Sequence, residues 1–242
     1  MLNVVCFKWG EKYSSKHVNL LYKQVKEHLH VDFKFHCITD KSSLLDNNIQ
    51  IYPFWGELKE IQNSVYTKGP LNNYKRLKLY DRSILKQFDY NVLMLDIDMI
   101  ICNDITFLAN LNRNSMWYSP TSGRNKFTLN TSVTRVVNDD FCKVWDQFIK
   151  SPFEIIKKTR KEGWKGTDQS ILTYFLKDKI NYLTKNDGIV SLRDDIEIFK
   201  KYSNQIPEWI RIIAFYGEKE TGDPADKYIQ KIYPWIKTVW KD

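Results

Sequence analysis

The first forty residues combine short apolar runs with one stretch of helical periodicity. Residues 2–7 (LNVVCF) form a β-branched apolar run, which predicts a buried strand. Apolar residues then recur at helical spacing, at Val18, Leu21, Val25 and Leu29, with Ser14 and Ser15 upstream as candidate caps. Residues 33–39 (FKFHCIT) alternate in polarity and predict a second strand. The order strand, helix, strand is the unit of a parallel sheet.

A second apolar pattern leads to a pair of acidic residues. Leu77, Tyr80, Ile84 and Phe88 predict one helix, which Asn91 ends. The continuous apolar run 92–95 (VLML) is typical of a central strand covered on both faces, and Asp96-Ile97-Asp98 follows it directly. The carboxyl ends of strands in open α/β sheets are where ligands bind.

The second half of the chain is less regular. Residues 132–137 and 210–216 predict strands, and Asp139 or Asp140 is a candidate cap for a helix carrying Phe141, Val144, Trp145 and Phe148. Thr167 is the candidate cap of a helix with Ile171, Leu172 and Phe175 on one face. With no internal repeat and no low-complexity linker, the sequence predicts a single α/β domain over residues 1–242.

Composition and charge narrow the class of partner. A chain of 242 residues that is 43% hydrophobic can bury a full core, and a net charge of +8 favours an anionic partner. The basic residues are spread along the chain without the dense arm that grips a duplex, so no nucleic-acid partner is expected. Four well-separated cysteines without a CxxC pair, and the lack of an apolar run of about 18 residues, predict reduced thiols and a soluble cytoplasmic protein.

The Asp96-Ile97-Asp98 triplet is a candidate metal site. In an extended backbone, two residues separated by one project to the same side. Paired carboxylates suit Mn²⁺ or Mg²⁺, whose remaining ligands are commonly phosphate oxygens and water. Such an ion would stabilise a diphosphate leaving group. The alternative is that one aspartate caps the following turn while the other is merely exposed.

Six segments together resemble a known family: VVCFKWG (4–10), YKRLKLY (74–80), VLMLDIDMII (92–101), LNTSV (129–133), GTDQSIL (166–172) and IIAFYGEK (212–219). The chain resembles GT-A glycosyltransferases, and is similar to glycosyltransferase family 8 and to compact viral and bacterial relatives of it. The resemblance implies one GT-A domain with a mixed, mainly parallel sheet. Residues 1–102 would form the nucleotide-sugar-binding half and 103–242 the acceptor-binding half.

The resemblance also implies a reaction. A hexosyl-type unit would move from a nucleotide-diphosphate sugar, expected to be a UDP-sugar, to a hydroxyl of a glycan or glycoconjugate. Similarity to family 8 favours retention of the anomeric configuration. An inverting route would need a carboxylate base on the acceptor hydroxyl, for which Asp168 is the candidate.

Donor-binding residues follow from the same resemblance. Cys6, Phe7 and Tyr13, in the loop after the first strand, would contact the nucleobase and ribose, although plain core packing is an equal alternative for Tyr13. Arg76 would lie near the diphosphate, against the alternative of a solvated helical arginine. Ile97, between the two aspartates, belongs to the same donor-binding set.

Residues later in the chain would surround the transferred sugar. Asn130 would face the sugar, and Asp168 and Gln169 match the Asp-Gln pair that borders the reacting sugar carbon. Asp168 could also be an acidic residue favoured by the helix dipole at an N-terminus, and both roles can coexist. Lys219 would contact the diphosphate, with an ordinary surface lysine as the alternative.

One departure from the family pattern bears on activity. Family 8 enzymes carry a third metal ligand, a histidine, in a late HFxG-like segment, where this chain has Ala214-Phe215-Tyr216-Gly217. Either water and phosphate complete the coordination of the metal, or the affinity for the metal is reduced and the activity with it. The alternative that is not an enzyme is a pseudoenzyme that binds a sugar nucleotide or glycan, and Ala214 motivates it.

Two further alternatives concern the motif and the tail. A haloacid-dehalogenase-like phosphatase also has an apolar run followed by DxD, but there the motif normally opens the domain. Residues 233–241 mix aromatic residues with lysines. They predict either packing on the domain, which we favour, or a peripheral membrane contact.

Overall fold

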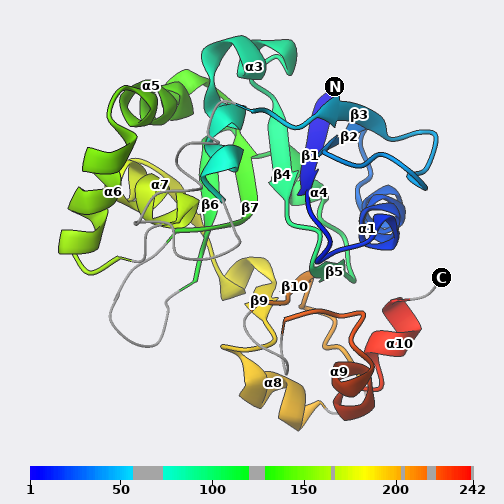
Figure 1. Ribbon diagram of the computed structural model, residues 1–242. Coiled ribbons are helices and arrows are strands. Elements are labelled where there is room, and N and C mark those ends of the chain that lie inside the picture. Colours follow the sequence, from blue (N-terminus) through cyan, green and yellow to red (C-terminus); the bar gives the residue numbers. More distant parts are fainter. Residues whose placement is uncertain (57–72, 120–128, 165–166, 203–204, 217–221, 241–242) are drawn as a thin grey trace. The chain divides into compact units, whose positions relative to one another are not determined.

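The computed structural model describes residues 1–56, 73–119, 129–164, 167–202, 205–216 and 222–240 (Figure 1). The chain divides into two compact units. Unit 1 comprises residues 1–52, 95–110 and 183–242, and unit 2 comprises residues 53–94 and 111–182. Each unit therefore draws on segments from both sides of residue 102.

The strands form a larger and a smaller sheet. The larger sheet has seven strands in the order β3-β2-β1-β4-β7-β6-β8, and the smaller has the order β5-β10-β9. The seven are β1 (Leu2–Lys8), β2 (Phe33–Thr39), β3 (Gln50–Pro53), β4 (Val92–Leu95), β6 (Ser115–Tyr118), β7 (Leu129–Val136) and β8 (Asn181–Leu183). The three are β5 (Met99–Ile101), β9 (Ile189–Ser191) and β10 (Ile212–Ala214). The predicted α/β class is confirmed.

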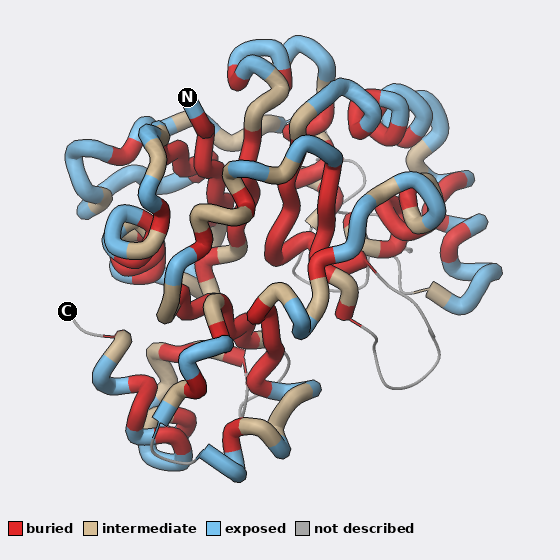
Figure 2. The backbone as a smooth tube through the Cα atoms, turned by 180° about the vertical axis from the view of Figure 1, so that it is seen from behind, coloured by how far each residue is buried: buried red, intermediate tan, exposed pale blue. Residues whose placement is uncertain are grey.

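Helices connect these strands. The α-helices are α1 (Ser15–His28), α3 (Arg82–Gln87), α4 (Thr106–Ala109), α5 (Cys142–Lys150), α6 (Pro152–Lys161), α7 (Asp168–Leu176), α8 (Ile196–Lys201), α9 (Lys227–Ile232) and α10 (Ile236–Val239). The 3-10 helices are η1 (Asn73–Tyr80), η2 (Asp139–Phe141) and η3 (Lys185–Asp187). Figure 2 shows buried strands and helices whose outer faces are exposed.

The start of unit 1 is the predicted strand, helix and strand. β1 pairs in parallel with β2, from Leu2 opposite Phe33 to Lys8 opposite Thr39. All seven residues of β1 are buried, as expected for a strand covered on both faces. Ser14 is the N-cap of α1, and the apolar stripe predicted for this helix is buried.

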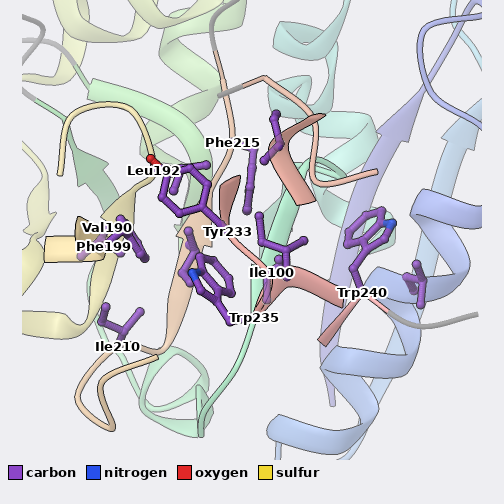
Figure 3. Close-up of a cluster of buried hydrophobic side chains, with 13 residues drawn as sticks. Ile100, Val190, Leu192, Phe199, Ile210, Phe215, Tyr233, Trp235 and Trp240 are labelled. Atoms are coloured by element: carbon purple, nitrogen blue, oxygen red, sulfur yellow. The ribbon is translucent and has the colours of Figure 1, made fainter. Parts of the chain in front are cut away.

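The smaller sheet carries a hydrophobic cluster of its own (Figure 3). β10 pairs antiparallel with β5 and parallel with β9. Aromatic side chains of the C-terminal segment complete the cluster, and Tyr233, Trp235 and Trp240 are 7%, 4% and 5% exposed. The favoured prediction for the tail is confirmed, because these three aromatic residues pack on the domain. Their burial removes the side chains on which a membrane contact was suggested.

Unit 2 corrects two sequence predictions. The helix predicted through Leu77 and Phe88 is two elements, η1 and α3, because the Asp81 carboxylate accepts the Ser83 backbone N–H at 2.7 Å and caps α3. Neither Asp139 nor Asp140 caps α5, whose N-cap is Phe141 without a side-chain hydrogen bond. Both aspartates lie in η2, which Asn138 caps by accepting the Asp140 N–H at 3.0 Å. Thr167 is the N-cap of α7, as predicted.

The four cysteines are free thiols, three of them buried. Among the described residues, no helix combines the length and the apolar character that a membrane crossing requires.

Candidate functional site

The Asp96-Ile97-Asp98 triplet connects β4 to β5 in unit 1. The backbone bends at Ile97 and Asp98, so the condition under which the two aspartates would project to the same side, an extended backbone, is not met. Ile97 is nevertheless buried at 4% exposure, while both aspartates are partly exposed. Ile97 anchors the connection in the core, and the two carboxylates lie at its surface.

The two carboxylates are close enough to interact electrostatically. Burial, and then the negative charge of Asp96, raise the pKa of Asp98 well above its usual range. A hydrogen bond from the Tyr13 hydroxyl to Asp98 Oδ2, 2.5 Å long, and the charge of Lys12 oppose this shift. A divalent cation would relieve the repulsion between the carboxylates, and their oxygen atoms are the ligands that Mn²⁺ and Mg²⁺ prefer. The pair therefore fits a hard metal ion.

The segment expected to supply a third metal ligand runs beside Asp98. Ala214 in β10 lies opposite Met99 in β5, and the Phe215 backbone N–H donates to the Asp98 carbonyl oxygen at 2.9 Å. The Ala214 side chain is a buried methyl group. Within the described part of the chain, no group of three or more His, Cys, Asp and Glu side chains could hold a metal. A metal at this pair would depend on water and a ligand for its remaining positions.

Two of the residues predicted to contact the nucleobase lie in a strand and not in a loop. Cys6 and Phe7 lie inside β1, two residues and one residue before its end at Lys8, and not in the loop that follows. Both side chains are buried, and burial raises the pKa of the Cys6 thiol. Tyr13 does lie in the loop and is partly exposed. Burial and the neighbouring Asp98 raise the pKa of the Tyr13 phenol.

A buried ion pair in unit 2 joins two of the predicted residues. Arg76 Nε donates to Asp168 Oδ2 at 2.8 Å, and an Nη of the same guanidinium lies 2.6 Å from that oxygen. The two side chains are 9% and 1% exposed, so the alternative of a solvated Arg76 is wrong. Asp168 opens α7, as the helix N-terminal reading predicted. That Asp168 acts as the general base of an inverting reaction stays a prediction.

Polar side chains extend this pair along β7 and α7. Arg76 also donates to the Thr131 hydroxyl at 2.5 Å. The Gln169 amide donates to Asn130 Oδ1 at 3.3 Å, and the same oxygen accepts the Ser132 backbone N–H at 2.8 Å. Asn130 is buried, and Gln169 is partly exposed. The structure thus brings together the four residues predicted in this part of the chain.

Sequence reasoning missed three residues that contact the predicted ones. They are Thr131, which accepts from Arg76, and the pair His17 and Asp223, whose Nε2 and Oδ1 lie 3.1 Å apart next to Tyr13. For His17 the sequence did hold one signal: Ser14, three residues earlier, is a candidate N-cap, and a residue at that spacing can return a hydrogen bond to the cap. Lys219 lies outside the described residues.

The fold is that of the GT-A glycosyltransferases. Solved structures similar to this chain include the galactosyltransferase LgtC in complex with donor and acceptor sugar analogues, with a TM-score of 0.65 and 14% identity over 99% of this chain and 95% of that one. The glycosyltransferase GlyE of Streptococcus pneumoniae has a TM-score of 0.58 and 16% identity, over 100% of this chain and 62% of that one. The bifunctional glycosyltransferase WbbM has a TM-score of 0.59 and 14% identity, over 99% of this chain and 51% of that one. This fold removes the basis for the phosphatase alternative.

Comparison by sequence gave no match, either with protein-family models or with curated proteins.

Proposed function

We propose that this protein is a metal-dependent glycosyltransferase that moves a sugar from a nucleotide-diphosphate donor, expected to be a UDP-sugar, to a hydroxyl of a glycan or glycoconjugate. The observation that carries the proposal is the pair of partly exposed carboxylates, Asp96 and Asp98, directly after β4 of a GT-A fold. In such sheets, ligands bind at the carboxyl ends of strands.

Asp96 and Asp98 would hold Mn²⁺ or Mg²⁺ in unit 1. When bound, the ion would supply positive charge against the diphosphate as the glycosidic bond breaks. The protein contributes the two carboxylates and the buried anchor Ile97 between them. The position of Ala214 in the sequence leaves water and the donor's phosphate oxygens as the remaining ligands, which Mg²⁺ commonly accepts.

The polar residues of unit 2 would serve the transferred sugar. Gln169 is partly exposed and holds Asn130, so both amides are ordered before a ligand arrives. Arg76 binds Asp168 Oδ2 through two nitrogens. A general base for an inverting route would have to give up this buried ion pair, and that cost supports a retaining reaction. Contact of Arg76 with the diphosphate stays a prediction.

The direct test is a screen of nucleotide sugars for release of free nucleotide, with Mn²⁺, with Mg²⁺ and with a chelator. We expect metal-dependent release from at least one UDP-sugar. Asp98→Asn should abolish it, since the amide removes one of two anionic ligands. Asp89→Asn, the same change at an aspartate three residues before the start of β4, is the matched control and should keep full release. Unchanged release by Asp98→Asn would count heavily against the proposal.

A second candidate is a pseudoenzyme that binds the sugar nucleotide without turnover. The buried methyl group of Ala214 beside Asp98 favours it, because the described residues offer no third protein ligand. Calorimetry with UDP, with and without Mn²⁺, distinguishes the candidates when it is run beside the release assay. Metal-dependent UDP binding without release from any donor would support the pseudoenzyme.

A further inference from the structure

We propose that Tyr13, His17 and Asp223 form a chain of contacts that fixes the Asp98 carboxylate for binding a divalent cation. The inference rests on the proposed function, because it assumes that Asp98 is a metal ligand. It assigns to Tyr13 a positioning role in place of the predicted nucleobase contact, and it brings two unpredicted residues into the site.

The first link joins Tyr13 to Asp98. The phenol donates to Asp98 Oδ2 at 2.5 Å across 85 residues of sequence. A hydrogen bond to one carboxylate oxygen fixes the plane of the group while leaving acceptor capacity for a cation. With only two carboxylates available, the orientation of each one matters more than in a site with three protein ligands.

Tyr13 itself needs support, because it lies in the irregular segment between β1 and α1. The His17 ring packs against the Tyr13 ring, with centroids 5.0 Å apart. His17 lies in the first turn of α1 and is buried at 5% exposure. The regular helix thus holds the irregular loop through one pair of rings.

Hydrogen bonds on both sides of the imidazole fix its orientation. The Ser14 backbone N–H donates to His17 Nδ1 at 3.3 Å, so Nδ1 is the acceptor nitrogen of the ring. Nε2 is then the donor nitrogen of the ring, and it donates to Asp223 Oδ1 at 3.1 Å. Neither ring nitrogen is left to bind a metal in this arrangement, which suits a positioning role.

The C-terminal segment holds the far side of His17. Asp223 is fixed in turn by the Ala225 backbone N–H, which donates to Oδ1 at 2.7 Å. The Trp240 ring meets His17 edge-on, with centroids 5.3 Å apart, and belongs to the hydrophobic cluster of Figure 3. A capping role alone would need only the bond between His17 and Ser14. The further contacts with Asp223 and Tyr13 connect the cluster to the carboxylate.

The test measures binding of Mn²⁺ alone to the full chain, by electron paramagnetic resonance of the free ion, so that it does not depend on catalysis. Outer-shell partners of metal ligands typically contribute 10- to 100-fold in affinity. We expect Tyr13→Phe to weaken Mn²⁺ binding by about that factor. Tyr22→Phe, the same change in α1 at a residue that packs on Phe35, is the control and should bind as the wild type does.

Two substitutions of His17 separate its two hydrogen bonds. In His17→Gln the amide can replace Nε2 and keep the bond to Asp223, and in His17→Asn it can replace Nδ1 and keep the bond to Ser14. Both variants lose the ring that packs on Tyr13, so we expect both to weaken Mn²⁺ binding, His17→Asn by about 10-fold and His17→Gln, which keeps the bond to Asp223, by less. Asp223→Ala, which removes the acceptor of the Nε2 bond, gives the same information if His17→Asn does not fold, as judged by its circular dichroism and thermal midpoint.

The outcomes separate this inference from the proposed function. If Asp98→Asn loses Mn²⁺ while Tyr13→Phe and His17→Asn bind as the wild type does, the positioning chain is overturned and the metal site stands. If only Tyr13→Phe weakens binding, the extension to His17 and Asp223 is wrong. If Asp98→Asn binds Mn²⁺ like the wild type, the metal site itself falls.

Discussion

The buried pair of Arg76 and Asp168 makes a quantitative prediction about stability. Asp168→Asn would leave a guanidinium that is only 9% exposed without its counter-charge, and Arg76→Met would do the same to a carboxylate that is 1% exposed. Breaking a buried pair from one side costs about 3–5 kcal/mol. For a chain of this size, such a loss lowers the thermal midpoint by roughly 6–20 °C.

The double variant isolates the interaction between the two charges. In Arg76→Met with Asp168→Asn neither charge remains buried, so its cost should be well below the sum of the single costs, with a coupling of at least about 1 kcal/mol. The assay is urea unfolding of all four proteins at one pH. Arg82→Met is the matched control, because Arg82 pairs with Asp139 at the surface, with both side chains about half exposed. It should change stability far less than either single variant of the buried pair, because solvent screens an exposed ion pair.

Additive costs in the cycle would refute this reasoning, since they would mean that the two charges do not interact. Single-variant losses no larger than that of Arg82→Met would show that solvent screens the pair.

Three further predictions follow from buried groups. Burial, with Lys34 adding to it, lowers the pKa of His36 to about 4; the unfolded chain therefore binds a proton that the folded chain does not, and stability should fall as the pH drops from about 6.5 to about 4. Urea unfolding at pH 7.5 and pH 5 should show a loss of about 2 kcal/mol that His36→Gln lacks, and equal losses would contradict the assignment. Gly188 has φ of +79°, and an added Cβ would lie 2.5 Å from the Trp209 carbonyl oxygen, so Gly188→Ala should cost at least about 1–3 kcal/mol in the same assay; Gly10→Ala, with similar φ but open space, should cost less. Trp145→Phe removes a 2.8 Å hydrogen bond to Asp81 and should cost about 1–3 kcal/mol, a loss that Trp209→Phe at the exposed surface should not show.

The helices and strands that the sequence predicted correctly are those whose own residues carry a clear apolar pattern. β1, β2, β4, α1 and α7 follow from apolar runs and helical periodicity that those segments carry themselves. The break at Asp81 was missed because it depends on a carboxylate that caps α3 and also accepts the Trp145 indole, 64 residues away. The spacing of apolar residues within a segment carries no information about a contact between distant residues.

The residues of the candidate site likewise fall into those that the sequence revealed and those that only the structure revealed. Asp96 and Asp98 were found because their chemistry follows directly after an apolar strand. Arg76 and Asp168 were each singled out, but their pairing across 92 residues was not. His17 and Asp223 are 206 residues apart, and no spacing in the sequence links them. Contacts that depend on the folded chain, such as these, required the structure.

The interleaved order of the two units has a consequence for synthesis on the ribosome. The last segment of unit 2 ends at residue 182, whereas unit 1 still needs residues 183–242. Unit 2 can therefore become complete while the nascent chain is still growing. Unit 1, which contains β1 and β2, has to wait for residues 183–242 with an unfinished apolar surface, and such surfaces are what chaperones cover.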